Sequence, residues 1–315
     1  MTIDILLTGA RGQLGSELFR RAAGLSVHAV DRDGLDISDR ASVMQAVERL
    51  TPKAVINAAA YTAVDKAEGD VAAAYAVNRG GPEYLAEACA AQGIPMIHVS
   101  TDYVFDGSRS GAYREDDAVA PLGVYGESKL AGEEAVRGML SRHVILRTAW
   151  VYGIDGQNFV KTMLRVGAER DALKVIDDQH GCPTFAGDLA EAGLIIARRM
   201  IDGTVPAGGF GTFHCTGRGT TTWCGFARKI FDLAGTHLPK VPTVEAITTA
   251  EYPTSAKRPA NSVLDCSRLQ QVYGIRLRPW EAALTEMLDA VLTETEETAS
   301  ARAPAARTRT RGETP

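Results

Sequence analysis

The sequence contains few of the features that mark exported, membrane-bound or nucleic-acid-binding proteins. Its five cysteines are an odd number among 315 residues and include no CxxC pair, which argues against a disulfide framework and a cysteine zinc site. Lys and Arg (34) are outnumbered by Asp and Glu (39), whereas binding to nucleic-acid phosphates requires a basic excess. No apolar run approaches the roughly 18 residues of a membrane span, and no signal-peptide pattern precedes the first predicted strand. We therefore expect a cytoplasmic protein that binds neither nucleic acid nor membrane.

Hydrophobic residues make up 45% of the chain, and in its first half they form short runs typical of buried strands. Five such runs alternate with helical patterns, at residues 3–8, 26–31, 53–59, 95–100 and 143–148. Strands that alternate with helices predict right-handed βαβ units, and continuous apolar runs indicate a sheet covered on both faces. The predicted fold class is α/β, with a doubly wound parallel sheet of the Rossmann type.

The pattern loosens after Trp150, where helices are predicted at 187–200 and 221–235 with short strands between them. We expect an NAD(P)-binding Rossmann domain at residues 1–150. Residues 151–292 are expected to form mainly a smaller substrate-binding lobe, some segments of which return to the first domain. Residues 293–315 contain almost no apolar side chains and are predicted to be a disordered tail.

A glycine-rich stretch, "TGARGQLG", connects the first predicted strand to the first predicted helix. Such a turn, with Gly9, Gly12 and Gly15, lets the backbone approach a pyrophosphate while the helix offers its first free N–H groups. The alternative is a tight turn without a ligand. Asp31 ends the second strand, where a carboxylate accepts hydrogen bonds from the ribose of NADH, whereas the neighbouring Arg32 would meet the 2′-phosphate of NADPH. We therefore expect the protein to use both cofactors.

Tyr125 and Lys129 are four residues apart at the head of a predicted helix, so both side chains lie on one face. A phenol beside an ammonium group suits acid catalysis, with Lys129 and a bound nicotinamide expected to lower the pKa of Tyr125. Ser100, Thr101 and Asp102 end the fourth strand, at the sheet edge where open α/β folds bind ligands. A hydroxyl there could bind the reacting oxygen, although both hydroxyls could instead cap the following turn.

Seven motifs resemble the extended short-chain dehydrogenase/reductases, in the order found in that family. They are "TGARGQLG", "NAAAYTAVDKAE", "STDYVFDG", "PLGVYGESKLAGE", "RTAWVYG", "DDQHGCPT" and "RPANSVLD". The resemblance covers roughly residues 3 to 290. It is strongest to members that reduce the C4 ketone of a dTDP-linked 4-keto-6-deoxy sugar with NADPH or NADH, so it implies that reaction.

The resemblance also implies a role for individual residues. Those expected along the cofactor are Gly12, Gln13 and Leu14 at the pyrophosphate, Asp31 at the ribose, Asp36 and Ile37 at the adenine end, and Ala60, Tyr61 and Thr62 beyond the third strand. At the sugar, Thr101 and Asp102 would contact the substrate and Trp150 would pack against it. Tyr125 would donate the proton, while Lys129 would tune Tyr125 and hold the nicotinamide ribose.

A metal ion is not expected among the site residues. The six histidines show no metal-ligand spacing. Some family members form a dimer bridged by a metal that glutamates hold, and Glu17 matches one such position. Gly187 and Ala290 stand at the other two, so the sequence gives no basis for a bound magnesium ion and leaves a homodimer open.

Two other functions compete with simple reduction. A sugar-nucleotide 4,6-dehydratase carries Asp-Glu after the strand-end threonine, whereas Tyr103 follows Asp102 here, which favours reduction over elimination. A noncatalytic dinucleotide-binding subunit is the second alternative, because the regulatory subunit of methionine adenosyltransferase resembles the same family. Trp150 and "DDQHGCPT" favour the reductase.

Overall fold

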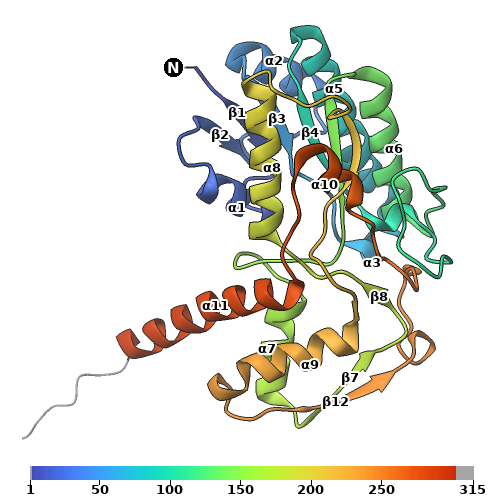
Figure 1. Ribbon diagram of the computed structural model, residues 1–315, viewed down its shortest axis with the longest axis vertical. Helices are drawn as coiled ribbons and strands as arrows, with labels where there is room; N and C mark the ends of the chain where they lie inside the picture. The colour runs from blue at the N-terminus through green and yellow to red at the C-terminus, as the bar shows by residue number, and fades with distance from the viewer. Residues whose placement is uncertain (1, 303–315) are drawn as a thin grey trace, which may run out of the picture.

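The computed structural model describes residues 2–302, without the side chains of 294–302, and these residues form two packed parts (Figure 1). The larger part contains a six-stranded sheet with the order β10-β5-β4-β3-β1-β2, in which every neighbouring pair is parallel. This confirms the predicted doubly wound α/β fold. Its strands are β1 (Ile5–Thr8), β2 (Val27–Val30), β3 (Ala54–Asn57), β4 (Met96–Thr101), β5 (His143–Thr148) and β10 (Gly211–His214).

Helices cover both faces of this sheet because its central strands are apolar on both sides. Leu7, Ile56 and Leu146 pack with α1, α8 and α10 on one face, whereas Leu6 and Val55 pack with α2, α5 and α6 on the other. These helices are α1 (Gln13–Arg21), α2 (Arg40–Leu50), α5 (Gly81–Gln92), α6 (Val124–Met139), α8 (Ala186–Ile201) and α10 (Ser267–Tyr273). Short helices α3 (Val64–Ala67) and α4 (Val71–Tyr75) precede α5.

The smaller part has its own apolar core and lies below the carboxyl edge of the sheet in Figure 1. Phe226 and Ile230 of one helix pack there against Leu284 of another. Its elements are α7 (Phe159–Glu169), α9 (Trp223–Ala234), α11 (Trp280–Arg302) and the parallel pair β7 (Ala172–Ile176) and β12 (Thr243–Ile247). Two short strand pairs join the parts, β6 (Val151–Tyr152) with β9 (Thr184–Phe185) and β8 (His180–Gly181) with β11 (Thr221–Thr222).

The chain after residue 150 does not stay in the smaller part. Helix α8 packs on α1, and β10 adds a sixth strand beside β5. Residues 187–200 and 211–215 thus belong to the sheet domain, and the lobe is built around them from segments on either side.

The predicted disordered tail needs a correction over part of its length. Helix α11 extends to Arg302, so residues 293–302 are helical, and 303–315 lie outside the described residues. A low content of apolar side chains prevents a segment from forming its own core, but it does not stop a helix that is already packed from continuing through Glu, Ala and Arg, which favour helix.

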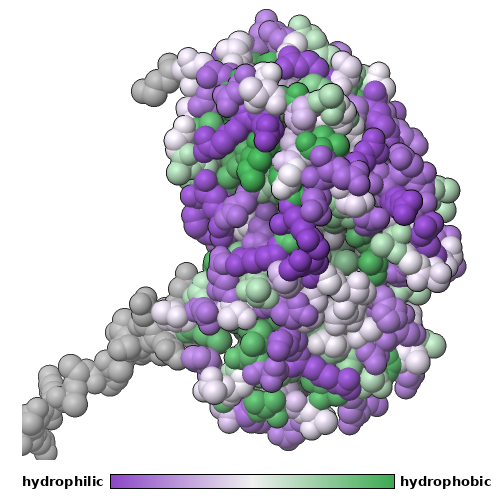
Figure 2. Space-filling view, viewed as in Figure 1, coloured by the Kyte–Doolittle hydropathy of each residue, from purple (hydrophilic) through white to green (hydrophobic). Residues whose placement is uncertain are grey.

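The surface seen in Figure 2 is mainly hydrophilic, and its hydrophobic residues form small separate patches. No helix within residues 2–302 is both long and apolar enough to span a bilayer. All five cysteines are unpaired, as expected from their number and spacing.

Candidate active site

A cavity of about 570 Å³ opens at the carboxyl ends of the central strands. It brings together the glycine-rich turn, the ends of β4 and β5, and the first turns of α6. The predicted site residues that line it are Gly9, Gly12, Gln13, Leu14, Ala60, Thr62, Thr101, Asp102, Tyr125, Lys129 and Trp150. Residues that are remote in the sequence therefore form one site.

The glycine-rich turn excludes a Cβ atom at two of its glycines, Gly9 and Gly15. Gly9 has a φ of +75°, and a Cβ atom there would lie 2.6 Å from the backbone nitrogen of Ala59. Gly12 is the N-cap of α1, and no side chain caps that helix. The turn therefore leaves a cradle at the N-terminus of α1, where the first N–H groups of the helix have no side-chain cap and fit the pyrophosphate of a dinucleotide. The N–H of Gly12 itself donates to the carbonyl oxygen of Gly9 at 3.0 Å. Gly15 instead lies under the turn, where a Cβ would clash with the carbonyl oxygen of Gly9.

Asp31 lies at the end of β2, next to a cation that the sequence analysis missed. Its Oδ2 pairs with Arg11 Nε at 2.6 Å, and its Oδ1 accepts a hydrogen bond from the N–H of Asp33. Arg11 also lines the cavity. Arg32, the predicted 2′-phosphate partner, is exposed and pairs with Asp36 at 3.3 Å. Two guanidinium groups rather than one therefore lie near the expected ribose position.

The remaining predicted cofactor residues do not line the cavity. Asp36 binds the hydroxyl and N–H of Ser38, and Ile37 is buried in the core between the sheet and α5. The N–H of Tyr61 donates to Asn78, and its hydroxyl donates to Asp70. Contacts of these residues with an adenosine stay predictions.

Tyr125 and Lys129 project from the start of α6, as their spacing predicted. Burial raises the pKa of Tyr125 to about 12, and the neighbouring Thr101 hydroxyl opposes this shift. Lys129 Nζ donates a hydrogen bond to the carbonyl oxygen of Val99 at 2.6 Å, and burial lowers its pKa to about 8. Desolvation of the phenol dominates this shift, and the expectation that Lys129 and a bound nicotinamide together lower the pKa of Tyr125 stays a prediction. Tyr125 is a protonated acid at neutral pH.

Thr101 and Asp102 meet at the end of β4. The Thr101 hydroxyl donates to Asp102 Oδ1 at 3.1 Å and accepts from the N–H of Tyr103 at 3.2 Å. Burial raises the pKa of Asp102 to about 6, although the hydroxyls of Ser262 and Thr101 act against this shift. Thr101 thus caps the turn and also lines the cavity, and its contact with a reacting oxygen stays a prediction.

Ser100 does not offer its hydroxyl to a reacting oxygen. It donates to the buried carboxylate of Glu133 at 2.5 Å, and that carboxylate also accepts two hydrogen bonds from Arg147 at 2.8 and 2.9 Å. Glu133 is one helical turn after Lys129 on α6. This buried ion pair therefore anchors α6 to β4 and β5 next to the predicted catalytic residues.

Trp150 is held by features that no sequence motif indicated. Its φ of +49° is uncommon for a residue with a side chain, and its ring stacks on Trp223 with centroids 3.6 Å apart. Gly181 faces the Trp150 ring so closely that a Cβ there would clash with it. Strained backbone of this kind is typical of binding sites.

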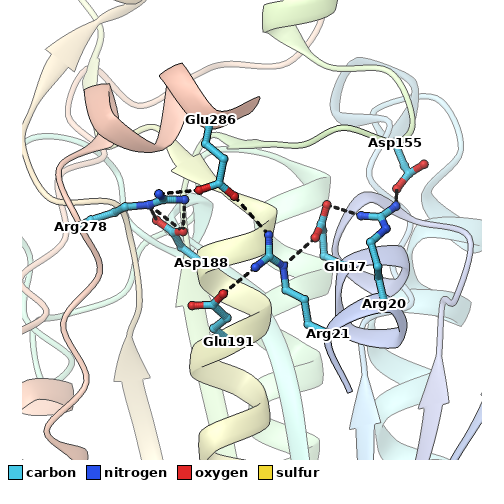
Figure 3. A network of polar contacts seen from close by, with 8 residues as sticks. All are labelled: Glu17, Arg20, Arg21, Asp155, Asp188, Glu191, Arg278 and Glu286. Carbon is cyan, nitrogen blue, oxygen red and sulfur yellow. Dashed lines mark hydrogen bonds and ion pairs between the residues drawn. The ribbon is translucent and has the colours of Figure 1, made fainter. Parts of the chain in front are cut away.

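The residues at the predicted metal position do not fit a magnesium ion. Glu17 is fully buried, with one carboxylate oxygen 2.5 Å from Arg20 and the other 2.8 Å from Arg21 (Figure 3). The Arg21 guanidinium also pairs with Glu191 and lies against Gly187. Both oxygens of the carboxylate that would have bound the metal are therefore paired with guanidinium groups. No cluster of metal-ligating side chains occurs within the described part of the chain.

The parallel sheet, glycine-rich turn and Tyr/Lys pair in one cavity define an extended short-chain dehydrogenase/reductase. A family model described as "RmlD substrate binding domain" matches residues 2–293. The chain belongs to this family, which is that of the dTDP-4-dehydrorhamnose reductases.

Similar proteins cover almost the whole chain. A dTDP-4-dehydrorhamnose reductase from Aggregatibacter actinomycetemcomitans is 47% identical over 89% of this chain and 96% of its own length. A crystal structure of such a reductase from Clostridium acetobutylicum has a TM-score of 0.86 at 41% identity, covering 92% of this chain and 99% of that one. Another from Bacillus anthracis, in complex with NADP, has a TM-score of 0.84 at 35% identity and covers 92% and 100%.

Proposed function

We propose that the protein reduces the C4 ketone of dTDP-4-dehydro-L-rhamnose to give dTDP-L-rhamnose, with NADPH or NADH as the reductant. The observation that carries this proposal is the single cavity that holds the glycine-rich turn, Tyr125, Lys129 and Trp150. The names of the relatives support the identity of the sugar nucleotide.

Backbone and side chains around the cavity fit a nicotinamide dinucleotide. The pyrophosphate would lie on the cradle formed by Gly12, Gln13 and Leu14, and Gly9 leaves the room that a Cβ would take. When bound, the nicotinamide supplies the hydride that reduces the ketone. Lys129, which lines the cavity, would hold the nicotinamide ribose.

Proton transfer is assigned to Tyr125. Its raised pKa keeps the proton on the phenol until an alkoxide forms at C4 of the sugar. Lys129 stabilises the resulting tyrosinate by its charge. The Thr101 hydroxyl, which donates to Asp102 Oδ1 in the protein alone, would turn its proton to the oxygen that changes charge. Trp150 packs against an apolar face of the sugar.

The nucleotide is assigned to a second cavity of about 340 Å³ in the smaller part of the molecule. Trp223 and Tyr252 supply aromatic surface for a base, while Lys174 and Arg258 supply cations for a diphosphate. Trp223 stacks on Trp150 of the first cavity, so the two cavities lie on either side of one aromatic pair. Binding energy from the nucleotide would orient the ketone.

Cofactor consumption with the keto sugar tests this function. Substrate produced in place by the upstream enzymes is added to the protein with NADPH or NADH, and absorbance of the reduced nicotinamide is followed. We expect consumption of both cofactors that depends on the sugar. Consumption of neither would replace the reductase with a noncatalytic dinucleotide-binding subunit.

Cofactor preference is predicted to depend on Asp31. Asp31→Ala removes the ribose acceptor and releases Arg11 for a 2′-phosphate, so the ratio of kcat/KM for NADPH to that for NADH should rise about 10-fold. Asp33→Ala is the matched control, since Asp33 is exposed and lies 3.6 Å from the same guanidinium. An unchanged ratio in Asp31→Ala would refute the role of Asp31.

The pH dependence is predicted to follow Lys129. Below pH 8 its ammonium is charged and stabilises the tyrosinate, so kcat/KM should fall as pH rises through about 8. Glu133 opposes the loss of this charge, and the nearby His98 is held neutral by burial. In Lys129→Arg the cation persists, and the fall should disappear from the measured range up to pH 9.5. The same fall in both proteins would assign it to another group.

We also propose a cytoplasmic location, which the unpaired cysteines support. No step of the proposed reaction requires a metal ion.

A further inference from the structure

Thr148, at the end of β5, has a buried hydroxyl oxygen without a hydrogen-bond partner in the described part of the chain. The residue is 6% exposed and lines the main cavity. A buried polar atom without a partner is costly, and such atoms are rare outside functional sites. This hydroxyl is not explained by the roles assigned above.

The position of Thr148 relates it to Thr101. The two threonines are register partners in the parallel pair of β4 and β5, so they lie about 4.8 Å apart on adjacent strands with side chains on the same face of the sheet. Asp102 follows Thr101, is also buried, and has its Oδ2 atom without a partner. Two unsatisfied oxygens thus belong to residues that line the cavity beside the proposed reacting centre.

Both residues are held firmly by the chain around them. The residues just before Thr101 and Thr148 are Ser100 and Arg147, which both bind Glu133 in the buried ion pair. This arrangement limits the movement of the two strand ends. The Ser262 hydroxyl lies near Asp102 and lowers the pKa of its carboxyl. However, neither Asp102 Oδ2 nor the Thr148 hydroxyl has a hydrogen-bond partner in the described part of the chain, so a ligand is the natural partner.

We propose that Thr148 and Asp102 together bind the hydroxyl group vicinal to the ketone, at C3 of the sugar, and so select among 4-keto-6-deoxy sugars. This inference rests on the proposed function. A hydroxyl has one proton to donate and lone pairs to accept. The substrate hydroxyl would donate a hydrogen bond to Asp102 Oδ2, and its oxygen would accept a hydrogen bond from the Thr148 hydroxyl. One hydroxyl of the substrate would therefore give both unpartnered oxygens, those of Thr148 and Asp102, a hydrogen bond.

The test compares two substrates and three proteins. The substrates are dTDP-4-dehydro-L-rhamnose and its 3-deoxy analogue, and the proteins are wild type, Thr148→Val and Thr148→Ser. The kcat/KM of the wild type should be at least 10-fold lower for the analogue than for the natural substrate, because the Thr148 hydroxyl and Asp102 Oδ2 then stay without a hydrogen-bond partner. Thr148→Val should lower kcat/KM about 3-fold to 10-fold for the natural substrate and leave that for the analogue nearly unchanged. Thr148→Ser should retain the discrimination.

Thermal unfolding provides an independent readout. Removal of an unpartnered buried hydroxyl by an isosteric side chain should leave the melting temperature of Thr148→Val equal to or above that of the wild type. Thr8→Val is the matched control, because Thr8 is also buried but its hydroxyl donates to Asn57 at 2.7 Å. The Thr8→Val substitution should lower the melting temperature and leave the ratio of kcat/KM for the two substrates unchanged.

The outcomes separate this inference from the proposed function. Reduction of the natural substrate with equal losses on both substrates in Thr148→Val, or with no loss on either, overturns the role of Thr148. Failure of the wild type to reduce either substrate overturns the proposed function, and the inference with it.

Discussion

Tyr125→Phe is expected to lower turnover about 100-fold to 10,000-fold while cofactor binding stays near that of the wild type. The substitution keeps the ring that packs edge-to-face on Tyr103, with centroids 5.3 Å apart, and removes only the hydroxyl. Without it the alkoxide at C4 must take its proton from water. Single-turnover kinetics and titration of NADPH fluorescence measure the two quantities separately.

Tyr103→Phe is the matched control for this variant. Tyr103 lines the same cavity, and burial raises its pKa well above the ordinary value, but it is not assigned a proton to transfer. Turnover within about 10-fold of the wild type is expected. Wild-type turnover in Tyr125→Phe, or an equal loss in both variants, would mean that the acid has been assigned to the wrong residue.

Gly15→Ala should produce the second large effect, on cofactor affinity. The new methyl group would overlap the carbonyl oxygen of Gly9, which is backbone and cannot move aside as a flexible side chain can. The turn and the start of α1 must therefore separate. We expect the dissociation constant for NADPH to rise at least 10-fold and the free energy of unfolding to fall by about 1–3 kcal/mol.

Gly138→Ala supplies the comparison, because Gly138 is also helical and a Cβ there meets no atom within 4 Å. Replacing an unstrained helical glycine with alanine should raise stability by about 0.5–1 kcal/mol and leave cofactor affinity unchanged. Equal NADPH affinity in the two variants would show that Gly15 does not support the cradle. Calorimetric titration and thermal unfolding provide the data.

The sheet and the placement of Tyr125 and Lys129 on one face of a helix could be predicted because local sequence carries their signals. Continuous apolar runs indicated strands covered on both faces, and the five predicted strands are β1 to β5. Tyr125 and Lys129 are four residues apart, so in a helix their side chains lie on the same face. The glycine-rich turn could likewise be predicted, because glycines stand between a predicted strand and a predicted helix.

The rest of the site depends on contacts between distant segments, which spacing does not encode. Trp223 is 73 positions after Trp150 yet stacks on it, and Gly181 is defined only by the ring that it faces. Thr148 lies beside Thr101 only because of the register in which β4 and β5 pair. Arg11 lies inside the glycine-rich motif, and its side chain was overlooked because the motif is read for its backbone. The direction of the pKa shift of Tyr125 also depends on burial.

The most direct test of the central claim is the transfer of deuterium from NADPH labelled at C4 of the nicotinamide to the sugar. Each of the two C4 stereoisomers of labelled cofactor is incubated with dTDP-4-dehydro-L-rhamnose and the protein, and the product is examined by NMR. The account predicts dTDP-L-rhamnose with deuterium at C4 of the sugar from one stereoisomer and hydrogen from the other. Oxidation of the cofactor without deuterium at C4 from either stereoisomer, or no product at all, would contradict direct hydride transfer to this ketone.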